Sequence, residues 1–190
     1  MANLFSKTSE LPTKREFAGN LRIIGRISYW IHLLLGVASG IVLFLAAFSR
    51  SFAEESRNIF FGFSIFLAIA ALVALGFRVY WAFRYTRMAK RLQQPNPNLH
   101  PKREEVIRVL RIGLIVSLAG LVLAFIASDI TAIGVLAKAM AQPQGVAVYD
   151  PEKIVREMDL FLILADVNLI GAHILGSVNS LGLLNWITKE

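Results

Sequence analysis

The sequence contains no cysteine among its 190 residues. That absence excludes disulfide bonds, thiolate metal sites and cysteine nucleophiles. The chain also lacks a G-x-S-x-G pattern, an H-E-x-x-H pattern and a glycine-rich phosphate loop, which are the short motifs typical of hydrolases, zinc proteases and nucleotide-binding proteins. We therefore expect a protein that is not an enzyme.

Charged residues are almost absent from four long apolar stretches. Residues 27–49, 58–77 and 167–188 contain none, and residues 112–137 contain Asp129 alone. A run of about 18 or more apolar residues is long enough to cross a bilayer core as a helix. We therefore predict an all-α polytopic membrane protein, a four-transmembrane-helix bundle that forms one integral membrane domain over residues 1–190. The predicted spans are residues 23–48, 58–78, 112–137 and 163–187.

The positive charge of the chain, formally +7, lies beside these spans. Residues 78–111 contain nine basic and two acidic residues. Basic residues mark the cytoplasmic side of a membrane, so we predict that the basic loop 79–111 and both termini are cytoplasmic. We expect no nucleic-acid binding, because the charge is accounted for by the membrane flanks. We also expect no transit peptide, which favours a bacterial-type membrane.

The second predicted helix should continue past its span to Leu92, through alternating aromatic and basic residues. Long basic side chains can lie along apolar surface while their charged ends reach water. We predict that the bilayer's anionic headgroups are a partner of this segment, at about 1 kcal/mol of attraction per cation. The lipid-facing basic residues of this prediction are Arg84, Arg87, Lys90 and Arg91.

Small residues recur where helices are expected to meet. Gly36 and Gly40 form a G-x-x-x-G pair, a spacing that lets two helix backbones approach closely. In the third helix small residues recur every three or four positions and so line one face. The fourth helix is expected to start at Asp150-Pro151-Glu152. The glycines assigned to helix packing are Gly36, Gly40, Gly113, Gly120 and Gly176.

Polar residues within the spans are candidates for function, because a membrane interior makes them costly. The rise of 1.5 Å per helical residue places Asp129 and Asp166 at the outer interface. His173 lies deeper and shares a helix face with Asp166. The candidate polar or ligand residues are His173, Asn168, Asn179, His32, Asp166 and Asp129.

Three interpretations of these polar residues stay open. The first is hydrogen bonding between helices, worth about 0.6 kcal/mol each. The second is an ion or metal pathway with His173, Asp166 and Asp129 as ligands, since imidazole and carboxylate suit iron or manganese. The third makes His173 or His32 an axial ligand to a tetrapyrrole. The residues alone do not identify a metal.

The chain resembles the chloroplast inner-envelope translocon/iron-permease family, which has cyanobacterial members. The likeness lies in three blocks that cover about half the chain. These blocks are residues 85–92, residues 113–139 with Gly113, Gly120 and Thr131, and residues 159–181 with Asp159, Asn168, His173, Gly176 and Ser180.

The resemblance implies a four-helix membrane protein that acts in iron permeation or in a protein-import translocon. It favours Asn168 and His173 as functional positions, since Asp129 and Asp166 depart from the uncharged residues usual in plastid members. We therefore expect a transport-type protein with iron as a candidate substrate, in a cyanobacterial plasma membrane or thylakoid. The alternative is an accessory or assembly subunit of a larger photosynthetic membrane complex, in contact with chlorophyll. Either a homo-oligomer or such a complex is the expected assembly.

Overall fold

The computed structural model describes residues 14–48, 59–141 and 155–188, which form four long α-helices and one short 3-10 turn. Helix α1 spans Lys14–Phe48, α3 spans Ile59–Leu92, α4 spans Arg103–Met140 and α5 spans Glu157–Thr188, with the 3-10 turn η1 at Pro97–Leu99. All four helices are long and apolar enough to cross a membrane. The predicted all-α, four-span bundle is confirmed.

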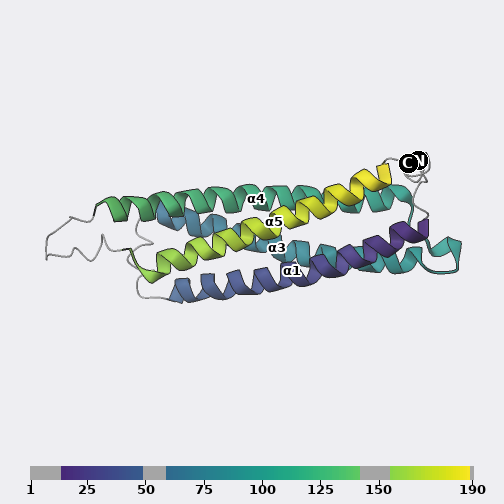
Figure 1. Cartoon of the computed structure of the whole chain (residues 1–190), viewed down its shortest axis with the longest axis horizontal. Helices are drawn as coiled ribbons and strands as arrows, with labels where there is room; N and C mark the ends of the chain where they lie inside the picture. Colours follow the sequence, from purple (N-terminus) through teal and green to yellow (C-terminus); the bar gives the residue numbers. More distant parts are fainter. Residues whose placement is uncertain (1–13, 49–58, 142–154, 189–190) are drawn as a thin grey trace, which may run out of the picture.

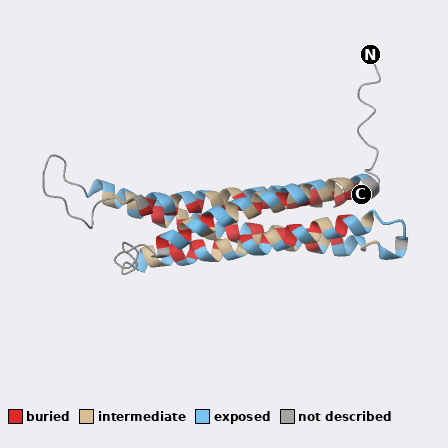
Figure 2. Ribbon diagram, turned by 90° about the horizontal axis from the view of Figure 1, so that it is seen from below, coloured by how far each residue is buried: buried red, intermediate tan, exposed pale blue. Residues whose placement is uncertain are grey.

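The four helices run alternately up and down and lie side by side as an elongated bundle (Figure 1). Helix α1 packs against α3, α3 against α4, α4 against α5, and α5 against α1, which closes the ring. Helices α3 and α5 also make contact across the diagonal. Buried residues face the bundle axis and exposed residues face outward along the whole length (Figure 2).

Each helix extends beyond its predicted span at one end or both. Helix α3 continues without a break to Leu92, as the sequence predicts, because no proline or glycine interrupts residues 77–92. Helix α5 begins at Glu157, after two non-helical residues, so it does not run continuously from the predicted start at Asp150. The proposed cap at residues 150–152 lies outside the described residues. The start at Glu157 has its own reason, since Asp159 accepts a hydrogen bond of 2.9 Å from the backbone N–H of Arg156, as in a capping box.

The predicted helix contact at Gly36 and Gly40 is looser than the contact at Gly25. A Cβ added to Gly36 or Gly40 of α1 would lie 3.4 Å and 3.8 Å from Leu75 and Leu72 of α3, which is ordinary contact. A Cβ on Gly25 would lie 3.1–3.2 Å from the side chains of Thr86 and Tyr85. The tighter approach of α1 to α3 is therefore at Gly25, which the sequence did not single out.

Candidate functional site

An arginine lies fully buried near the middle of the bundle. Arg78 of α3 has no exposed surface. Its Nη1 donates a hydrogen bond of 2.9 Å to the hydroxyl of Tyr85, and its Nη2 donates one of 2.9 Å to the backbone carbonyl of Gly176 on α5. No carboxylate of the described residues forms an ion pair with Arg78. A buried charge without a counter-charge is costly, so this position is a functional candidate.

Side chains from the other helices converge beside this arginine at Gly176. A Cβ added to Gly176 would lie 2.6 Å from Ser117 Oγ of α4, 2.9 Å from Arg78 Nε and 3.0 Å from His32 Nε2 of α1. All three atoms are buried and lack a hydrogen-bond partner among the described residues. His32, Arg78, Ser117 and Gly176 come from four different helices, and we name them the arginine layer.

The ring of His32 is oriented by the preceding turn of its own helix. Its Nδ1 forms hydrogen bonds with the backbone carbonyl and the hydroxyl of Ser28. A carbonyl can only accept, so Nδ1 carries the proton and Nε2 of the neutral ring is an acceptor. The arginine layer therefore presents one acceptor (His32 Nε2), one cationic donor (Arg78 Nε) and one hydroxyl (Ser117) that have no partner among the described residues.

His173 lies next to this layer in a space that a glycine provides. Its Nε2 donates a hydrogen bond of 3.1 Å to the carbonyl of Ala71 on α3, and its Nδ1 has no partner in the described chain. A Cβ on Gly120 of α4 would overlap the imidazole ring. Gly113 has the same role for the Arg78–Tyr85 pair. These two glycines of α4 thus make room for polar groups on the neighbouring helices.

A second polar cluster lies nearer the other end of the bundle. Asp166 of α5 is 1% exposed and accepts a hydrogen bond of 3.4 Å at Oδ2 from the Thr131 hydroxyl of α4. The Thr131 hydroxyl lies 2.6 Å from that of Ser64 on α3. Asp166 Oδ1 has no partner in the part of the chain that the structure describes. We name Ser64, Thr131 and Asp166 the aspartate layer.

A small apolar cluster separates the two layers. Its residues belong to α3, α4 and α5. On each of these helices they lie between the residue of the arginine layer and the residue of the aspartate layer. All its members are fully buried, and the His173 imidazole that hydrogen-bonds to the carbonyl of Ala71 lies beside them. The central apolar cluster consists of Ala71, Leu75, Ala124, Leu169 and Ala172.

One face of α5 connects these features along the bundle. Its buried polar residues recur at intervals of three, four or seven positions, which places them on one side of a helix. Asp159, at the end beyond the aspartate layer, binds Lys138 of α4 at 2.8 Å. We name this face the polar stripe of α5; its members are Asp159, Asp166, His173, Ser177 and Ser180.

Residues 11–188 match the family described as "protein of unknown function (DUF3611)". The chain belongs to this family. It is also 32% identical over 174 residues to "Protein TIC 21, chloroplastic" of Arabidopsis thaliana, a match that covers 87% of this chain and 55% of the relative. The chain thus spans about half the length of that relative. No solved structure matches the chain.

This membership confirms the resemblance on which the sequence analysis relied, and the protein is an integral membrane protein of the DUF3611 family. The match to the TIC 21 relative links it to a chloroplast protein.

The structure places the predicted site residues in three different environments. His32, His173 and Asp166 are buried between the helices; the level predicted for Asp166, at the outer interface, stays a prediction. Asn168 and Asn179 are half-buried, and Asp129 is exposed. The basic residues Arg84, Arg87, Lys90 and Arg91 lie at the half-buried or exposed surface of the α3 extension, with Arg84 over the Trp81 ring at 4.4 Å.

The predicted metal ligands do not come together in the DUF3611 protein. Asp129 faces outward, whereas Asp166 and His173 face the bundle axis and lie seven residues, or roughly 10 Å, apart on α5. No group of three His, Asp or Glu side chains that could hold a metal exists among residues 14–48, 59–141 and 155–188. His32 and His173 are fully buried between helices, so neither ring faces a tetrapyrrole on the bundle surface.

Arg78 is the residue that the sequence reasoning missed. It is the first of the nine basic residues of 78–111, whose charge pattern predicts a position beside the spans. The sequence does contain a pattern that predicts its burial. Arg78 lies seven residues from both Ala71 and Tyr85 and so shares a helix face with them, whereas Arg84, Arg87, Lys90 and Arg91 are outside this heptad spacing. All three residues of that face are buried.

Proposed function

We propose that this protein is a transport-type integral membrane protein whose solute pathway follows the polar stripe of α5. The observation that carries the proposal is the burial of that stripe. Its five polar side chains are at most 6% exposed, and they extend over most of the bundle length. Polar side chains are costly inside a membrane. Those that face the interior of a helix bundle mark ion and substrate paths.

The central apolar cluster is the gate in this proposal. It separates the arginine layer from the aspartate layer, and its five side chains are fully buried. Hydrophobic constrictions close a path by excluding water. Opening then requires α5 to move away from α3 and α4 at Leu169 and Ala172, which would join the two polar layers.

A small cation is the solute that the aspartate layer supports. Asp166 offers a carboxylate oxygen without a partner among the described residues, next to the hydroxyls of Thr131 and Ser64. Iron is the candidate that the family resemblance implies. One carboxylate and two hydroxyls form a weak set of oxygen ligands, which suits passage of an ion better than its storage.

The arginine layer then acts as a charge barrier on the same path. Arg78 carries a fixed positive charge, and a cation that leaves the aspartate layer meets it after the central apolar cluster. Arginine in a narrow pore raises the barrier to cations. A polypeptide substrate, as in a translocon, would need a wider opening than one four-helix bundle closed at this level provides.

The test is uptake of ferrous iron into vesicles that contain the purified protein. We expect Asp166→Asn to abolish uptake and Arg78→Gln to raise it. Asp129→Asn is the matched control, because it removes the same charge at an exposed position of α4. Equal loss of uptake in Asp129→Asn and Asp166→Asn, or uptake by none of the proteins, would refute the proposed pathway.

A second function, as an accessory subunit of a larger membrane complex, is favoured by glycines on the outer surface. A Cβ added to Gly76, Gly134 or Gly182 would meet no atom within 4 Å, and all three residues are exposed. Glycine costs a helix about 1 kcal/mol relative to alanine, and in membranes small residues allow another helix to approach.

Purification in mild detergent distinguishes the two functions. A stoichiometric complex with a larger membrane protein supports the accessory function, whereas a homo-oligomer alone contradicts it.

A further inference from the structure

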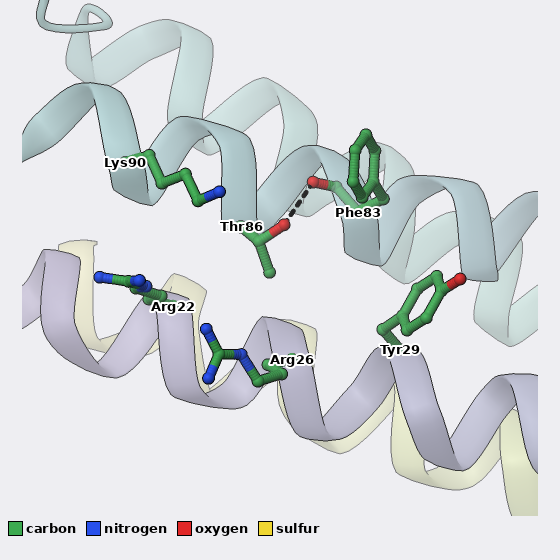
Figure 3. Close-up of a pocket in the computed structure, with 6 residues that line it drawn as sticks. All are labelled: Arg22, Arg26, Tyr29, Phe83, Thr86 and Lys90. Carbon is green, nitrogen blue, oxygen red and sulfur yellow. Dashed lines mark hydrogen bonds between the residues drawn. The ribbon is translucent and has the colours of Figure 1, made fainter.

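A groove between α1 and α3 gathers three cations at one end of the bundle. It has a volume of about 170 Å³ and is lined by Arg22, Arg26 and Tyr29 of α1 and by Phe83, Thr86 and Lys90 of α3. Figure 3 shows Thr86 of α3 pointing toward the gap between the two helices, with Lys90 beside it on α3 and Arg22 and Arg26 on α1. Six side chains from two helices thus form one site.

Helices α1 and α3 approach closely beside the groove. A Cβ added to Gly25 of α1 would be 3.1 Å from Cγ2 of Thr86, which lines the groove. The Thr86 hydroxyl donates a hydrogen bond of 2.7 Å to the carbonyl of Phe83. The Thr86 proton is therefore used within α3, and the donors that the groove offers are the side chains of Arg22, Arg26 and Lys90.

The positive charge of the groove is not neutralised within the described residues. Arg22 donates a hydrogen bond of 3.2 Å to the neutral side chain of Gln93. No carboxylate of residues 14–48, 59–141 or 155–188 forms an ion pair with Arg22, Arg26 or Lys90. Arg22 and Arg26 are four residues apart on one helix, where like charges repel each other. An anion that binds between them would relieve that repulsion.

The position of the groove identifies the source of that anion. Trp30 is 63% exposed and Tyr80 is 59% exposed, and both lie one turn or less from groove residues, on the outer surface of the membrane-spanning helices. Exposed tryptophan and tyrosine mark the level of the lipid headgroups. Phe83, which lines the groove, is 47% exposed and faces the same apolar surroundings. The ligand thus meets cations on one side and lipid on the other.

We propose that this groove binds the headgroup oxyanion of an anionic glycerolipid. The guanidinium groups of Arg22 and Arg26 are suited to a tetrahedral phosphate or sulfonate, and Lys90 adds a point charge from α3. The volume of about 170 Å³ equals that of roughly five or six waters at about 30 Å³ each, which is enough for the oxyanion and part of the glycerol. The acyl chains extend past Phe83 and Tyr29 into the bilayer.

A lipid at this place would link α1 to α3 by charge. The two helices contribute two cations and one cation, respectively, to the same anion. The bound headgroup therefore holds the ends of the helices together at the level of Gly25. This effect is independent of whether a solute passes through the bundle.

The experiment measures retained lipid by native mass spectrometry of the full chain released from nanodiscs that contain phosphatidylglycerol and phosphatidylcholine. We expect Arg22→Gln/Arg26→Gln/Lys90→Gln to retain at least tenfold less phosphatidylglycerol than the unmodified protein. Lys102→Gln/Arg108→Gln/Arg111→Gln is the matched control, because it removes three cations at exposed positions outside the groove, and we expect less than a twofold change. Arg26→Gln alone, at an exposed position, repeats the test with less risk to folding and should reduce retention several-fold.

Two results would overturn the proposal. Equal loss of phosphatidylglycerol in the groove variant and in the matched control would show general surface attraction in place of a site. Displacement of the bound lipid by millimolar inorganic phosphate would show that the groove takes free phosphate and not a lipid headgroup. Neither result depends on ion flux, so the proposed lipid site and the proposed transport function fail separately.

Discussion

Arg78 Nη2 of α3 donates a hydrogen bond of 2.9 Å to the carbonyl oxygen of Gly176 on α5. This bond crosses the diagonal of the bundle, between two helices that are not neighbours in the ring. It is possible because Gly176 has no side chain, and Arg78 Nε and Ser117 Oγ fill the space that a Cβ would take. The buried position of the Arg78 guanidinium therefore requires a residue without a Cβ at position 176.

Gly176→Ala is predicted to destabilise the protein by about 1–3 kcal/mol, the usual cost of overpacking a core. The added Cβ would lie 2.6 Å from Ser117 Oγ and 2.9 Å from Arg78 Nε. Gly182→Ala on the same helix is the control, because nothing lies within 4 Å of its added Cβ, and it should not lower stability. Thermal unfolding in detergent measures both. An equal change in the two variants would contradict the close packing described at Gly176.

Trp81→Phe is predicted to cost about 1 kcal/mol, since it removes an interhelical hydrogen bond from a buried side chain. Trp81 is 7% exposed, and its Nε1–H donates a hydrogen bond of 2.7 Å to the carbonyl of Val109 on α4. Trp30→Phe changes the same residue type at a position that is 63% exposed and should have little effect. The measurement is the unfolding temperature of each variant, and a larger loss for Trp30→Phe would refute the prediction.

Asp159→Ala is predicted to destabilise the protein more than Lys138→Met. Asp159 is fully buried, whereas the Lys138 side chain is 20% exposed, and the two are joined by an ion pair of 2.8 Å. Asp159 also accepts a hydrogen bond from the backbone of Arg156, which its removal leaves unsatisfied. We expect a coupling of about 1–3 kcal/mol between the two positions in a double-mutant cycle. Additive effects of the two substitutions would show that the pair contributes no coupling.

The absence of cysteine allows the orientation in the membrane to be tested with single introduced thiols. Asn98 is exposed in the connection between α3 and α4, and the excess of basic residues in this connection predicts that it is cytoplasmic. We predict that Asn98→Cys reacts with an impermeant maleimide only after the cells are opened. Ser51→Cys, in the connection between α1 and α3, should react in intact cells. The reverse labelling pattern would invert the predicted topology.

The sequence predicted the helices well because their signals are local. Runs without charge identify the spans, and the absence of helix breakers predicts the extension of α3 to Leu92. The face of α4 that contains Gly113 and Gly120 follows from helical spacing alone, and both glycines are buried.

The site was only partly predictable, because it depends on contacts between residues far apart in the chain. Asp166 is buried because Thr131 and Ser64 meet it from other helices. Arg78 is accommodated by Gly113 of α4 and Gly176 of α5. Charge and position along the chain place both residues at a membrane edge, and only the packing of four helices moves them inside.

The helices are longer than a bilayer requires. With 32 to 38 residues each, they measure roughly 48–57 Å at 1.5 Å per residue, against a hydrocarbon core of about 30 Å. At the basic end they remain packed, because the buried rings of Trp81 and Tyr85 lie in a cluster with Phe17 and Ile187. The cationic surface there is therefore rigid before any ligand arrives, and binding to it carries little entropic cost of ordering the backbone.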